Sequence, residues 1–247
     1  MRFLRVLLLT LIAGSWSAPE ADAEWIVGAY LGNLWTQTSK VSLTLPAQQT
    51  QVDIADVQYR GESFDSPQYY GYRVTWIPAA HRWLGIEGEL IHAKVFAEPS
   101  AAVHVQGRLR GLAVDTSLPL SSVVQRLAMS HGLNFVFVNL AMRRTLNRPA
   151  PGGRGIVGVL RVGVGPTVPH AESTIDGVDQ EQYQSGGVGA QVTGGLEIGL
   201  WRSLGLQGEY KYTWASPEID VVGGTATVPS RSHHVVAGLT WRFGLHP

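Results

Sequence analysis

Apolar and polar residues alternate along eight segments of the chain. The C-terminal segment is the clearest, because Val235, Ala237, Leu239, Trp241 and Phe243 share one face and polar or small residues share the other. A period of two predicts a β-strand with one apolar face. The other segments span residues 25–38, 67–77, 83–96, 130–143, 155–165, 188–201 and 204–214.

The connections between these segments alternate in length. Residues 78–81, 145–154 and 202–203 form short connections, whereas residues 39–66, 97–129, 166–186 and 215–230 form long ones. Transmembrane barrels show this pattern because their periplasmic turns are short and their extracellular loops are long. The sequence therefore predicts an all-β fold, an eight-stranded antiparallel up-and-down transmembrane β-barrel with both termini on the periplasmic side.

Aromatic residues sort to the two ends of the predicted strands, as expected for the girdles that bound the apolar band of a membrane barrel. The periplasmic set is Trp25, Trp76, Trp83, Trp201 and Trp241, and the opposite set is Trp35, Tyr70, Tyr210, Tyr212 and Trp214.

The N-terminus has the pattern of a secretory signal peptide. Arg2 and Arg5 precede the apolar residues 6–13, and residues 21–23 (Ala-Asp-Ala) offer a cleavage site. This apolar stretch is far shorter than the about 20 residues of a membrane-spanning helix. We therefore expect residues 1–23 to be a cleaved signal and residues 24–247 to form a single barrel domain in the cell outer membrane. The last strand, ending at Phe243, resembles the signal that the barrel-assembly machinery recognises, and we expect a monomer.

Composition narrows the function classes. The chain has 29 Gly, 8 Trp and 8 Tyr but only 15% charged residues, which favours a thin-walled β structure over an α/β enzyme. The formal net charge is zero, so the sequence lacks the excess of basic residues expected of a nucleic-acid-binding protein. Because the chain has no cysteine, disulfides and thiolate metal sites are excluded.

Alternation places four cations and four carboxylates inside the barrel: Arg73, Glu87, Glu89, Arg161, Glu197, Glu209, Lys211 and Arg242. An eight-stranded barrel is only wide enough for side chains, and unpaired buried charges are costly. We therefore expect an ion-paired interior rather than a pore. Glu87 and Glu89 could instead be a general acid and base, but two carboxylates on one strand face more often belong to a buried network.

Three histidines fall at the extracellular ends of three consecutive strands. His92 lies in the last part of the third predicted strand, His131 is the second residue of the fourth, and His170 follows the fifth, two residues before Glu172. Since consecutive strands are neighbours, we expect these residues to meet at the outer rim as a metal or acid/base cluster, and they are the candidate catalytic residues.

Three further residues are candidates for substrate binding: Lys94, Asn134 and Arg73. Lys94 is placed to meet a lipid phosphate as a point charge. The sequence leaves the identity of any metal or cofactor unknown.

Five segments, at residues 66–76, 89–97, 131–134, 168–172 and 208–213, occur in the same order as in a known family. Over essentially the whole mature chain, the sequence resembles the outer-membrane lipid A oxidases of rhizobia, small barrels of the outer-membrane protein A-like superfamily. The resemblance implies oxygen-dependent conversion of the proximal glucosamine of lipid A to 2-aminogluconate, with outer-membrane lipid or lipopolysaccharide as the partner.

Two functions fit the sequence. One is an enzyme that acts on lipid A from the outer leaflet. The other is a non-enzymatic barrel that supports envelope integrity or presents its loops for adhesion, and it needs no site. Fold alone does not decide between them.

Overall fold

The computed structural model describes residues 23–147 and 155–244 of the chain. The expected signal peptide therefore lies outside the described residues except for Ala23, as does most of the connection at residues 145–154. Within the described ranges, no helix has the length and hydropathy needed to cross a membrane.

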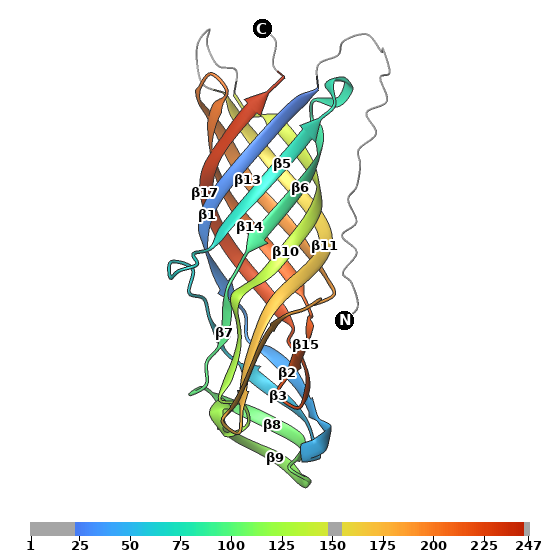
Figure 1. Cartoon of the computed structure of the whole chain (residues 1–247). Coiled ribbons are helices and arrows are strands. Elements are labelled where there is room, and N and C mark those ends of the chain that lie inside the picture. Colours follow the sequence, from blue (N-terminus) through green and yellow to red (C-terminus); the bar gives the residue numbers. More distant parts are fainter. Residues whose placement is uncertain (1–22, 148–154, 245–247) are drawn as a thin grey trace.

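Eight antiparallel strands close into a barrel, which confirms the predicted fold class (Figure 1). Each strand pairs with the next along the chain, and the last pairs with the first through Trp25 opposite Phe243. The strands are β1 (Glu24–Thr36), β5 (Tyr70–Ile77), β6 (Leu84–His92), β10 (Arg126–Thr145), β11 (Ile156–Ile175), β13 (Val188–Trp201), β14 (Leu204–Ala215) and β17 (Ser230–Phe243).

The barrel wall is apolar outside and largely polar inside. On β10, the outward residues Val138 and Leu140 are 63% and 50% exposed, whereas the inward residues Asn139 and Ala141 are fully buried. The same alternation runs along the other wall strands. An outward apolar face on a closed barrel is the surface expected of a barrel that lies in lipid.

The predicted loops contain a second sheet, which the sequence analysis did not anticipate. Its six strands come from three of the four long connections and lie beyond the barrel end that faces away from the C-terminus (Figure 1). In sheet order they are β15 (Glu218–Val221), β16 (Gly224–Thr227), β2 (Ser39–Leu45), β3 (Thr50–Val57), β8 (Ala102–Leu109) and β9 (Leu112–Pro119). We call this unit the loop sheet.

Buried side chains tie the loop sheet to the barrel. Leu43, Ile54 and Val105 of the loop sheet belong to one apolar cluster with Met129 of β10 and Ala171 of β11. The strands β10 and β11 continue past the barrel wall into this region, so the two sheets share a core (Figure 1).

Short elements complete the chain. They are the strands β4 (Tyr59–Arg60), β7 (Val95–Ala97) and β12 (Val178–Tyr183) and the 3-10 turns η1 (Pro46–Gln48), η2 (Ala79–His81) and η3 (Leu120–Ser122).

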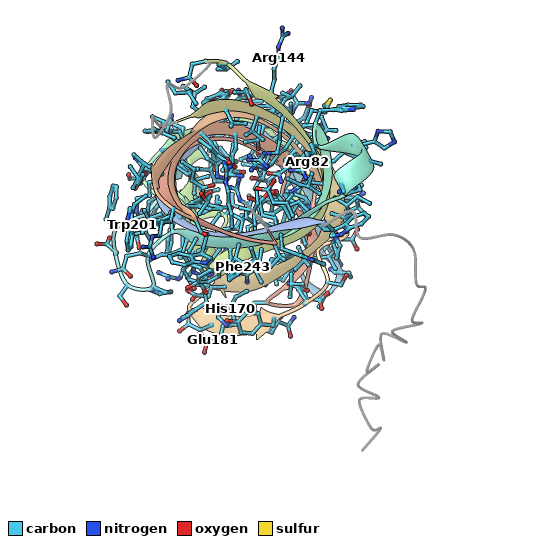
Figure 2. All side chains as sticks on the ribbon, turned by 90° about the horizontal axis from the view of Figure 1, so that it is seen from above. Arg82, Arg144, His170, Glu181, Trp201 and Phe243 are labelled. Carbon is cyan, nitrogen blue, oxygen red and sulfur yellow. The ribbon has the colours of Figure 1, made fainter. Side chains whose placement is uncertain are left out.

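The interior is an ion-paired network, as the sequence predicted. Arg73 donates to both oxygens of Glu209 at 2.6 and 2.7 Å, and Lys211 donates to Glu89 at 2.7 Å. Arg161 joins Glu209 to Glu87. Nearer the short turns, Glu197 pairs with two further cations, Arg242 and Arg143, of which the sequence analysis missed the second. Side chains fill the ring when it is viewed along the barrel axis (Figure 2).

Candidate functional site

Two long strands carry the candidate site. Both β10 and β11 have 20 residues and outrun the other wall strands. Beyond the wall, β10 pairs with β7 and β11 pairs with β12. The site lies on this extension, between the barrel and the loop sheet.

A bulge in β10 creates the local geometry. Met129 pairs with Ala171 and Leu133 pairs with Pro169, so residues 130–132 of β10 stand opposite His170 alone. Gly132 has φ +101°, and a Cβ there would lie 2.6 Å from Nδ1 of His92. Glycine is thus needed both for the backbone conformation and for the close approach. Bulges re-aim side chains, and this one brings His131 to His170.

The structure brings together three of the four candidate catalytic residues. Oε1 of Glu172 lies 3.8 Å from Nδ1 of His131 and 3.9 Å from Nδ1 of His170. The two imidazole rings are 4.7 Å apart and nearly perpendicular. His170 and Glu172 are mostly buried, whereas the His131 side chain is 54% exposed. We call these three residues the rim cluster.

Neighbouring residues fix the Glu172 carboxylate. Arg126 donates to Oε2 through Nε at 2.7 Å and lies 2.5 Å from it through Nη2. Ser130 donates to Oε1 and also lies 3.2 Å from Nδ1 of His131. Oε1 is therefore the oxygen that faces the two imidazoles. Neither residue stands out in the sequence, because Arg126 lies in a predicted loop and Ser130 belongs to no recognisable motif.

His92 lies beside the rim cluster rather than in it. Its ring stacks on Tyr70 at 4.8 Å, and its Nδ1 is 2.8 Å from Oδ1 of Asn134. The amide of Asn134 donates to the backbone carbonyls of His131 and Val168. Both ends of the Asn134 side chain are thus used within the protein. Asn134 holds the bulge in place, which differs from the substrate contact expected from the sequence.

Lys94 belongs to a group of cations next to the cluster. Its Nζ lies 3.7 Å from Glu62 and 5.7 Å from the centre of the Phe96 ring. Arg60 and Arg126 approach the same ring at 5.4 and 5.7 Å. We call Arg60, Lys94 and Arg126 the cation group, and Arg126 links it to Glu172.

Arg73 does not reach the rim cluster, and its assignment as a substrate-binding residue is corrected. Its side chain is 1% exposed, points into the lumen and pairs with Glu89 and Glu209. His170 and Glu172 instead share the outward parity of Leu160 and Val162. A lipid at the outer surface of the wall cannot contact a side chain inside it.

The rim cluster opens to the outside of the barrel. His170 lies outside the ring of the wall when the barrel is viewed along its axis (Figure 2). A hollow of about 460 Å³ adjoins the cluster and is lined by Arg126, Glu172, Thr174, Asp179 and Glu181, among others. Two imidazoles and a carboxylate in this setting can transfer protons or ligate a cation.

Comparisons with known proteins add a fold likeness only. No protein-family model and no curated protein matches the chain, so the lipid A oxidase family is not confirmed. Similar solved structures include the outer membrane protein OprG from Pseudomonas aeruginosa, at 11% identity over 91% of this chain and 97% of that one, with a TM-score of 0.41.

The outer membrane protein AlkL in DMPC bilayers is 12% identical over 95% of this chain and 96% of that one, with a TM-score of 0.40. The attachment invasion locus protein Ail of Yersinia pestis, bound to the heparin analogue sucrose octasulfate, is 10% identical over 90% and 98%, with a TM-score of 0.36. The chain is thus similar to small outer-membrane barrels, at a level that carries no argument about activity.

Proposed function

We propose that the protein is an outer-membrane β-barrel enzyme that oxidises the proximal glucosamine of lipid A. The apolar outer wall and the ion-paired interior support a barrel that lies in lipid and conducts nothing. The short turns then face the periplasm and the loop sheet faces the cell exterior. The resemblance in sequence supplies the specific reaction.

The outward position of the rim cluster is the observation that carries this proposal. The cluster lies on the lipid side of β10 and β11, at the level where the apolar wall gives way to polar residues. A lipid headgroup that diffuses in the outer leaflet reaches this level directly. The closed lumen offers no competing route.

Two exposed guanidinium groups suit a phosphate or carboxylate elsewhere on the lipid A headgroup. Arg60 and Arg126 are 46% and 47% exposed, and their unused N–H groups favour such oxygens. Lys94 is 4% exposed and pairs with Glu62, so it contributes positive charge from beneath. An imidazole or the Glu172 carboxylate can accept the proton of the C1 hydroxyl of the sugar. In the overall reaction the C1 hemiacetal, O₂ and H₂O give 2-aminogluconate and H₂O₂, so the sugar loses two electrons to oxygen.

Mass spectrometry of lipid A tests this proposal. Cells whose lipid A has a free C1 hydroxyl and that express the protein in air should yield lipid A with the added mass of one oxygen atom, and the same cells with an empty vector should not. His131→Ala should abolish the gain, because His131 is the exposed member of the cluster. His104→Ala should preserve it, since His104 is a partly exposed histidine that pairs with Asp115 on the loop sheet. An unchanged lipid A mass with folded wild-type protein would contradict the proposal.

One observation favours a second candidate, a non-enzymatic barrel that presents its loop sheet for adhesion. The β8–β9 hairpin forms the far end of the molecule (Figure 1), and Leu112 at its tip is 75% exposed. This candidate predicts the same lipid A in all strains and a loss of surface binding when the hairpin is removed.

A further inference from the structure

We propose that His131, His170 and Glu172 bind one divalent transition-metal ion. The inference deepens the proposed function and rests on it for the role of the ion, although the geometry of the site stands by itself. The ligand atoms are one ring nitrogen from each histidine and one oxygen of Glu172, and all lie within 4.8 Å of one another.

The distances are close to those of an occupied site. Zinc, for example, holds nitrogen and oxygen ligands at about 2.0–2.2 Å, so two ligands of one such ion lie roughly 3.0–3.5 Å apart. The Glu172 oxygen is 3.8 and 3.9 Å from the two imidazole nitrogens. No two of the three ligand atoms are more than 4.8 Å apart, so side-chain rotations that bring them closer together would let one ion contact all three.

The carboxylate is held as a metal ligand requires. Arg126 occupies Oε2 and leaves Oε1 directed at both imidazoles. The Ser130 hydroxyl also binds Oε1 and steadies it. Residues that orient a ligating carboxylate in this way tune metal sites from the second layer of contacts.

A buried nitrogen provides independent support. Nδ1 of His170 is inaccessible to solvent and has no hydrogen-bond partner among the described residues. A buried polar atom without a partner is costly, and such atoms in native proteins call for a specific explanation. An ion between His170, His131 and Glu172 would satisfy this nitrogen.

The donor set selects the class of metal. Calcium and magnesium prefer oxygen ligands, whereas imidazoles suit zinc, iron, copper and nickel. Two histidines and one carboxylate with open positions form the ligand set of non-haem iron(II) oxygenases. The 54% exposed side chain of His131 leaves the solvent side of such an ion open. An iron-class ion here fits a reaction that consumes O₂.

Cobalt(II) binding to the refolded full-length mature protein tests the inference. After treatment with a chelator, the protein in detergent is titrated with Co²⁺ and followed by visible absorption and equilibrium dialysis. We expect one ion per chain and ligand-field bands. Glu172→Gln and His131→Ala should each weaken binding on the order of 100-fold or more, whereas His104→Ala should bind as the wild type does. Heat-modifiable migration on gels shows that each variant is folded.

The outcomes separate this inference from the proposed function. Absent Co²⁺ bands, or binding that both cluster variants retain while folded, would overturn the metal site and leave Glu172 as the ion-pair partner of Arg126. Bound Co²⁺ with unmodified lipid A would uphold the metal site and reject the oxidase. Modified lipid A without metal binding would uphold the oxidase and reject the metal site. Because His131 is exposed, its variant stays informative even if a change at buried His170 prevents folding.

Discussion

Replacement of Arg73 by methionine tests the ion-paired interior. Arg73 is 1% exposed, donates to both oxygens of Glu209 and lies 3.0 Å from Glu89. The central network balances three cations against three carboxylates: Arg73, Arg161 and Lys211 against Glu87, Glu89 and Glu209. Methionine fills similar space without charge, so one buried carboxylate loses its compensation. Loss of one partner of a buried pair costs about 3–5 kcal/mol.

Reversible unfolding of the barrel in lipid vesicles, followed by tryptophan fluorescence in denaturant, measures this cost. Arg82→Met is the matched control, because Arg82 is exposed in the turn after β5, and surface substitutions usually change stability by about 0.5 kcal/mol or less. Adding Glu209→Gln to Arg73→Met restores the charge balance, so the double variant should be more stable than the sum of the single changes.

Equal unfolding midpoints for Arg73→Met and Arg82→Met would refute this reasoning. They would mean that water reaches the interior and screens the unpaired carboxylate. Additive effects of Arg73→Met and Glu209→Gln would likewise show that the two charges do not interact.

Three other outcomes are expected from the same structure. Arg242→Met should lower the free energy of unfolding less than Arg73→Met does, because Arg242 is 23% exposed and Glu197 still pairs with Arg143. Equal losses would show that the greater burial of Arg73 does not matter. Ile54→Ala should remove about 2–5 kcal/mol from the loop sheet, so proteolysis there should accelerate while the barrel keeps its gel shift; unchanged cleavage would show that Ile54 packs loosely. The wild-type protein should migrate differently on gels with and without boiling, as a closed barrel has no edge from which to unfold, and identical migration would argue against closure.

The barrel strands could be predicted because their signal is local. Alternation along β10 or β17 needs only the residues of that strand, and each strand pairs with its neighbour in sequence. The assembly of the loop sheet could not be predicted in this way. Its hairpins β2–β3, β8–β9 and β15–β16 are local, but they join through strands that are distant in sequence. Strand β16 pairs with β2, with Thr225 opposite Thr44, and β3 pairs with β8. None of these strands has a sequence feature that indicates its distant pairing partner.

The rim cluster was predictable in part for the same reason. Adjacency of β10 and β11 placed His131 near His170 and Glu172. The bulge at Gly132 was invisible, because only the structure shows its positive φ. Arg126 lies in the connection predicted at residues 97–129, but in the structure it is the first residue of β10. The sequence suggests both a lumen position and substrate binding for Arg73, but its inward parity on β5 is compatible only with the lumen.

The depth of the rim cluster in the membrane tests the central claim most directly. The chain has no cysteine, so single cysteines at Val138, His131 and Ala113 can each carry one nitroxide label. In lipopolysaccharide-containing vesicles, accessibility to O₂ and to a water-soluble nickel chelate reports depth. We expect the label at 138 to lie in the apolar core, the label at 131 at headgroup level and the label at 113 in water. A label at 131 that meets the nickel chelate as freely as one at 113 would contradict a site that lipid headgroups reach.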